Sequence, residues 1–245
     1  MMTRLKTLFR RLRHDRSGVA LMEFAFTLPI VLGIGGYGIE VSNLALMNLK
    51  ISQIALALAD NASRVGATSA LSTQQLREVD INDIFAGVRV QGKGIDLTTR
   101  GRVILSSLEN VQRTYSDGTS DTGPVQRLHW QRCIGLKSGT DYDSHYDTTT
   151  ATAGTDTAPA NAGKTMASGM GDAPALVNAP ASSGVMFVEI NYEVKPLFGT
   201  LLMSPSRVHY IASFIVRDNR DFSKLFNPSP VVATANKFTC DRYTT

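Results

Sequence analysis

A long apolar run at residues 19–39 constrains this chain more than any other feature of its sequence. An apolar helix of about 20 residues spans the roughly 30 Å hydrocarbon core of a bilayer. The run is interrupted by Glu23 and Tyr37, and a carboxylate inside a span is costly unless it has a partner. We therefore predict a transmembrane helix over residues 19–39, in which Glu23 needs a positive charge nearby.

Basic residues are concentrated immediately before this run. Residues 1–18 contain six Lys and Arg against Asp15 alone, and the remaining chain is close to neutral, although the whole chain carries a net charge of +4. Since basic segments stay on the cytoplasmic side of a membrane, we predict a cytoplasmic leader over residues 1–18 and an exported part beyond Glu40. A cleaved secretory signal is the alternative, but the run is long for one and Glu23 interrupts it. We expect no nucleic-acid partner, because no basic surface with interleaved aromatic residues follows.

The helical pattern continues past the predicted span. Apolar residues recur every three or four positions from Val41 through Ile51 and Leu58 to Val65, which is typical of a helix with one buried stripe. We expect a single helix from residue 19 to about Gly66, with its first half in lipid and its second half packed on an exported domain.

The exported domain is predicted to be α+β, with one further helix and a roughly four-stranded antiparallel sheet. Ser72 or Thr73 is expected to cap the helix, which runs through Glu78 towards Phe85 and ends in a turn at residues 91–94. Four segments have strand-like composition or alternation; they are residues 102–111, 125–132, 184–194 and 207–216. No segment has the pattern of a helical crossover between parallel strands, so an antiparallel sheet is expected.

Residues 137–183 differ from their surroundings in composition. They are rich in Thr, Ala, Gly, Ser, Asp and Pro and poor in large apolar residues, so they are expected to bury little surface against the cost of ordering. We predict a flexible low-complexity insertion at 137–183, within an exported domain made of residues 40–136 and 184–245.

The two cysteines, Cys133 and Cys240, both follow the predicted span. If this part of the chain is exported, an even count favours one disulfide between them. Two free thiols in a cytosolic protein are the alternative interpretation.

No sequence pattern indicates catalysis, a metal or a cofactor, and we predict a protein that is not an enzyme. Asp141, Asp143, His145 and Asp147 alternate as in an oxygen-ligand calcium loop, but the turn glycine and the distal Glu of such loops are absent. We interpret this segment as a solvated polar loop. Nucleophile elbows, phosphate-binding loops and zinc motifs are also absent.

The amino-terminal residues resemble a type IV prepilin, and more closely the TadE-like minor pseudopilins of the tight-adherence (Flp) pilus system. The resemblance rests on a basic leader that ends at Gly18, four apolar residues, and then Glu23 and Phe24. The long helix that leads into an antiparallel sheet also fits, as does the Trp130-Gln131-Arg132 strand. The chain is much longer than the major Flp pilins, which favours the minor class, whereas the insertion at 137–183 is not part of the family pattern.

This resemblance implies a pilin-like fold and a processing step. A membrane prepilin peptidase would cut between Gly18 and Val19, and the new amino group of Val19 would pair with Glu23 of a neighbouring subunit. Glu23 and Phe24 would then set the register of assembly. The implied partners are the peptidase, other pilins and pseudopilins, the Tad secretion machinery and the lipid of the bacterial inner membrane.

The expected function is therefore that of a structural subunit for assembly of a Tad-type pilus, with no cofactor. One alternative is an uncleaved single-pass anchor that tethers a periplasmic interaction domain in an envelope complex. A second is a membrane-bound hydrolase, which would need a concave site with convergent polar groups.

Overall fold

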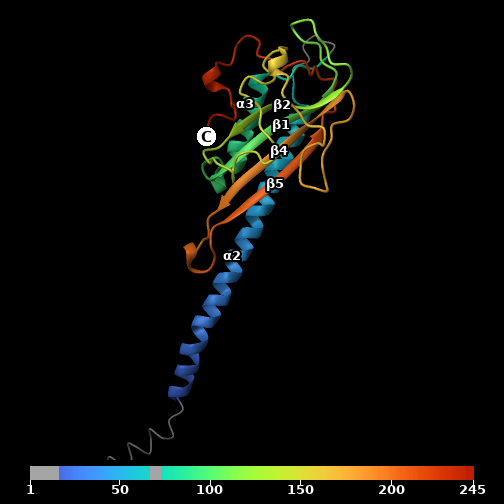
Figure 1. The fold of residues 1–245 in the computed structure, drawn as a ribbon. Coiled ribbons are helices and arrows are strands. Elements are labelled where there is room, and N and C mark those ends of the chain that lie inside the picture. Colours follow the sequence, from blue (N-terminus) through green and yellow to red (C-terminus); the bar gives the residue numbers. More distant parts are fainter. Residues whose placement is uncertain (1–16, 67–72) are drawn as a thin grey trace, which may run out of the picture. The chain divides into compact units, whose positions relative to one another are not determined.

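The computed structural model describes residues 17–66 and 73–245, and its chain has an α+β fold (Figure 1). The chain forms two compact units, of which the first contains Met1–Ala45 and Lys195–Pro205, and the second contains Leu46–Val194 and Ser206–Thr245. The longest element, helix α2 (Ser17–Arg64), contributes residues to both. Most of the predicted leader, residues 1–16, lies outside the described residues.

Helix α2 is continuous over 48 residues and includes Pro29. The predicted apolar stripe is buried in the second unit at Ile51, Ile54, Leu58 and Ala62, each at most 2% exposed, whereas Val41 at its start is 43% exposed. The helix ends at Arg64, two residues before the expected end at Gly66, which is within the usual uncertainty of helix boundaries.

Helix α3 (Glu78–Gly92) begins later than predicted. Of the two expected caps, Ser72 lies outside the described residues and Thr73 precedes the helix by five positions. The helix starts instead with a reciprocal cap, in which the Arg77 backbone N–H donates to Asp80 Oδ2 at 2.9 Å and the Arg77 guanidinium pairs with the same carboxylate. The short helices η1 (Lys93–Ile95) and α4 (Leu97–Arg100) follow it.

The sheet has five antiparallel strands, in the order β3-β2-β1-β4-β5. They are β1 (Gly101–Val111), β2 (Val125–Ile134), β3 (Lys164–Thr165), β4 (Ser183–Val194) and β5 (Ser206–Ile215). The four long strands agree with the predicted segments to within two residues at each end. The fifth strand corrects the four-stranded expectation, because two residues of the segment 137–183 pair with the edge of β2.

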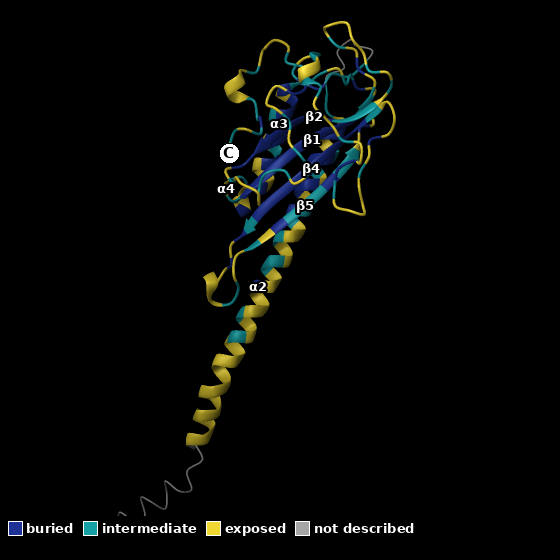
Figure 2. Ribbon diagram, viewed as in Figure 1, coloured by how far each residue is buried: buried dark blue, intermediate teal, exposed yellow. Residues whose placement is uncertain are grey.

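The sheet is covered on both faces, and its central strands are almost entirely buried (Figure 2). Side chains alternate between faces along a strand. One face meets α3, where Arg132 of β2 pairs with Glu78 at 2.5 Å. The opposite face carries a cluster that includes Leu108 and Phe187 of the sheet together with Met170 of the segment 137–183.

The segment 137–183 buries more than its composition predicts. Met170 and Ala179 are in the core cluster, and Gln126 of β2 donates to the Met166 carbonyl and accepts from the Ala179 backbone N–H. Two buried apolar residues and hydrogen bonds to backbone groups of the segment hold it against the sheet, although its composition is polar on average. Besides β3 it contains the short helix η2 (Pro159–Asn161).

The last thirty residues run beside the sheet, and Cys240 forms a disulfide with Cys133 of β2. The Cys133 backbone N–H also donates to the Phe238 carbonyl at 2.7 Å. Helix η4 (Thr234–Asn236) lies in this tail, and helix η3 (Gly199–Leu201) lies in the loop between β4 and β5.

Candidate functional site

The predicted processing and assembly residues lie in the first turns of α2, which begins at Ser17. Gly18 and Val19 are exposed, and no atom lies within 4 Å of the position that a Cβ on Gly18 would occupy. Phe24 is 60% exposed and Glu23 is also exposed. Among the residues that the structure describes, Glu23 has no ion-pair partner, so this part of the chain does not supply the positive charge that Glu23 is expected to need.

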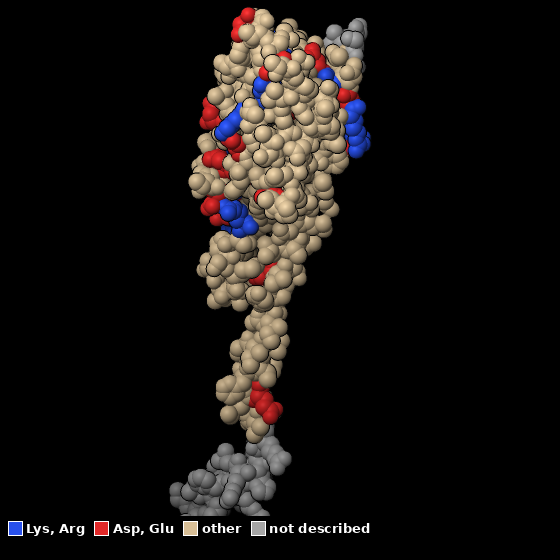
Figure 3. All heavy atoms as spheres, turned by 45° about the vertical axis from the view of Figure 1, so that its right-hand side comes forward, with Lys and Arg blue, Asp and Glu red and all other residues tan. Residues whose placement is uncertain are grey.

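The first half of α2 presents apolar side chains on all sides. Large apolar residues from Val19 to Ile39 are more than half exposed at most positions, and Glu23 and Glu40 are the only charged residues between Gly18 and Leu49. On the face drawn in Figure 3 this part of the helix is almost free of charge. Among the described residues, Gly18–Arg64 is the one helix long and apolar enough to cross a membrane.

Glu40 differs from Glu23 in being fully buried within the first unit. The Phe198 backbone N–H, in the loop Lys195–Pro205, donates to Glu40 Oε1 at 2.6 Å. Leu202 of the same loop packs so closely on Gly36 that an added Cβ would lie 2.8 Å from its Cδ1. Leu197 and Leu201 of this loop remain exposed, at 58% and 84%. Sequence reasoning missed this loop, because a short apolar connection gives no periodic signal.

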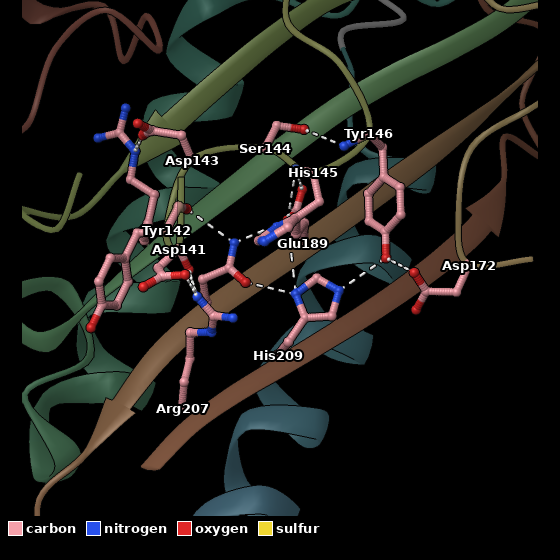
Figure 4. A network of polar contacts seen from close by, with 12 residues as sticks. Asp141, Tyr142, Asp143, Ser144, His145, Tyr146, Asp172, Glu189, Arg207 and His209 are labelled. Carbon is pink, nitrogen blue, oxygen red and sulfur yellow. Dashed lines mark hydrogen bonds and ion pairs between the residues drawn. The ribbon is translucent and has the colours of Figure 1, made fainter. Parts of the chain in front are cut away.

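A second group of polar residues gathers on the sheet face opposite α3, around Glu189 of β4 (Figure 4). The Glu189 side chain is 1% exposed, and His145 Nδ1 lies 2.6 Å from its Oε1. The Nδ1 atom of His209 on β5 lies 3.8 Å from the same oxygen. Tyr146 links His209 to Asp172, since the Tyr146 hydroxyl is 2.9 Å from His209 Nε2 and 2.7 Å from Asp172 Oδ1.

Two pKa values in this network shift because of burial. Burial lowers the pKa of the His209 imidazole, although the nearby Glu189 carboxylate acts in the opposite direction. Burial and the hydrogen bond to Asp172 raise the pKa of the Tyr146 hydroxyl. The network therefore keeps Tyr146 protonated and disfavours an imidazolium at position 209.

The four residues that alternate like a calcium loop do not converge on one point. Asp141 pairs with Arg207, Asp147 pairs with Lys164 at 2.6 Å, and Asp143 accepts the Gly139 backbone N–H. His145 instead turns inward to Glu189. This partner could not be inferred from local sequence patterns, because Glu189 lies 44 residues further along the chain.

A third candidate is a cavity of about 490 Å³ beside β1, lined in part by Arg113, His129 and Arg220. His129 is 1% exposed and its Nδ1 lies 2.9 Å from Glu109 Oε2, while Ser107 donates to the other oxygen of that carboxylate at 2.6 Å. Burial alone would raise the pKa of Glu109, but His129, Arg113 and Ser107 together lower it. Serine and histidine thus both contact the acid rather than each other, and this arrangement neutralises a buried carboxylate without activating a nucleophile.

Comparison with known proteins adds no identification. No protein-family model matches the chain, and neither the curated proteins nor the solved structures that were searched contain a match.

Proposed function

We propose that this protein is a minor, pilin-like structural subunit for assembly of a Tad (Flp)-type pilus, and that a prepilin peptidase removes its leader at Gly18. The observation that carries the proposal is the division of one 48-residue helix into two kinds of surface. The first half exposes apolar side chains and the Glu23 carboxylate, whereas the second half buries a stripe in the unit that contains the sheet.

Glu23 explains why cleavage would matter. In a bilayer or a bundle of apolar helices, an uncompensated carboxylate is strongly unfavourable, and no cation of the described chain reaches it. Cleavage after Gly18 creates an ammonium group on Val19, four residues away. Pairing of that group with Glu23 of a neighbouring subunit fixes the axial position of the two helices, and its main contribution is register rather than net stability.

The loop Lys195–Pro205 supports a membrane location for the first unit. Its exposed Leu197 and Leu201 belong to the same unit as the apolar half of α2, and Lys195 precedes them. Exposed leucines next to a basic residue are typical of segments that lie in the interface of a bilayer. Such a loop anchors the end of the span as well as covering Glu40.

A Glu23→Ala variant, expressed in the native cell, tests the role in assembly. We expect the variant to be inserted and cleaved as in the wild type, but to be absent from the sheared pilus fraction or to abolish piliation. Thr27→Ala, one helical turn further on and also exposed, is the matched control and should assemble normally. Normal piliation with Glu23→Ala would refute the register role and would favour an uncleaved anchor for a periplasmic domain.

A further inference from the structure

We propose that His145, Glu189 and His209 form a binding site for one divalent transition-metal ion of the zinc type. The proposal does not depend on cleavage at Gly18 or on a role in a pilus. The ligand atoms of the three side chains lie within 4.8 Å of one another, and Figure 4 shows both imidazole rings turned towards Glu189.

The first argument is the missing positive charge at Glu189. Three other buried carboxylates of the unit that contains the sheet each face an arginine: Glu78 pairs with Arg132, Asp80 with Arg77, and Glu109 with Arg113. Glu189 is as buried as these, but its ion-pair partners among residues 17–66 and 73–245 are the two histidines alone. A buried carboxylate needs compensation, and a metal ion supplies it without any lysine or arginine.

The second argument is the hydrogen-bond inventory of His209. The single Tyr146 hydroxyl proton is directed to Asp172, so the Tyr146 oxygen accepts from His209 Nε2–H. Asn191 uses its amide group to donate to Glu189 and to the Tyr142 carbonyl, so only its oxygen faces His209 Nδ1, at 2.6 Å.

A neutral imidazole has one N–H, and here it is used at Nε2. Nδ1 then carries a lone pair that faces the oxygens of Asn191 and Glu189 with no proton between them. A metal ion on Nδ1 resolves this conflict. It also places the Tyr146 hydroxyl and Asp172 behind the ligand, which is the outer-shell arrangement that orients metal-binding histidines.

The distances and donor types fit zinc better than calcium. Two imidazole nitrogens and one carboxylate oxygen suit zinc and its neighbours, whereas calcium requires six to eight oxygens. Tetrahedral bonds of about 2.0–2.1 Å place ligand atoms about 3.3 Å apart. The two His–Glu189 separations, 2.6 and 3.8 Å, lie on either side of this value, and all three ligand atoms lie within 4.8 Å of one another. The His145 and His209 side chains are 34% and 29% exposed, which leaves an entry path and an open fourth position for water.

The test is zinc binding by the purified full-length chain in detergent, without a histidine tag. Isothermal titration with ZnCl₂, and metal content after desalting, should give one Zn²⁺ per chain. His145→Gln changes a partly exposed loop residue and should weaken binding at least about 10-fold, the lower end of the loss seen even for outer-shell partners. His209→Gln should do the same.

The matched control is Asp141→Asn. Asp141 lies in the same loop, is 70% exposed, pairs with Arg207 and is not one of the three proposed ligands, so its loss should change zinc affinity far less than the loss of either histidine. Melting curves without metal establish that each variant is folded. No zinc binding by the wild type, equal affinity in His145→Gln or His209→Gln, or an equal loss in Asp141→Asn would overturn the proposal.

Discussion

Replacing Cys133 and Cys240 together with alanine should lower the free energy of unfolding of the sheet-containing unit by up to about 5 kcal/mol. The disulfide joins residues 107 positions apart, and closing a loop of about that length restricts the unfolded chain by about 4.7 kcal/mol in the chain-entropy model. The folded state should change little, because hydrogen bonds also hold the tail: the Cys133 N–H donates to Phe238, and the Arg102 side chain donates to the Cys240 carbonyl at 2.7 Å.

The single tryptophan provides the assay. Trp130 is 2% exposed in β2, three residues before Cys133, so its fluorescence reports unfolding of the sheet in a urea titration of the detergent-solubilised chain. The wild type in reductant should match the double variant, and the variant should not respond to reductant. A difference below about 1 kcal/mol between oxidised wild type and variant would show that the disulfide does not restrict the unfolded chain as argued.

Three further predictions concern the same unit. The folded pKa of Glu109 is below its unfolded value of about 4.3, so the stability that its charge provides is complete above the unfolded pKa and is lost as the pH falls through the folded pKa. Acid titrations should therefore show a steeper loss of stability in wild type than in Glu109→Gln. Arg132→Met leaves Glu78 buried without its closest partner and should cost about 3–5 kcal/mol in urea titrations, and a cost below 1 kcal/mol would contradict the pairing. Gly163→Ala, at a φ of +81° and with the Leu128 carbonyl of β2 against the added Cβ, should lower the melting temperature, whereas Gly118→Ala, at a φ of +85° in open space, should lower it less.

The regular elements were predictable because their patterns are local. The apolar spacing from Val41 to Val65 predicted the second half of α2, and alternation predicted β5 to within one residue. The start of α3 was wrong by several residues, since Arg77 and Asp80 form a cap that the usual N-cap residue types do not indicate. The two-residue strand β3 is too short for any periodic signal.

The candidate site was only partly accessible to sequence reasoning. Glu23 stands out because a carboxylate within an apolar run is unusual in any environment. Gly18 stands out because it ends the basic leader directly before that run. The group around Glu189 did not stand out, because its members come from three separate segments and acquire meaning only when β4 and β5 pair, with His209 opposite Asn191. The sequence around His145 is typical of a solvated loop, and no residue adjacent to it in sequence indicates the buried acid that it contacts.

The most direct test of the central claim is the mass of the amino-terminal peptide of the protein extracted from its native membrane. The proposed function predicts a mature chain that begins at Val19, with or without a methyl group on its amine, and accumulation of the full-length form in a Gly18→Leu variant. A native chain that retains residues 1–18 would contradict the account, because no new ammonium group would then exist for Glu23.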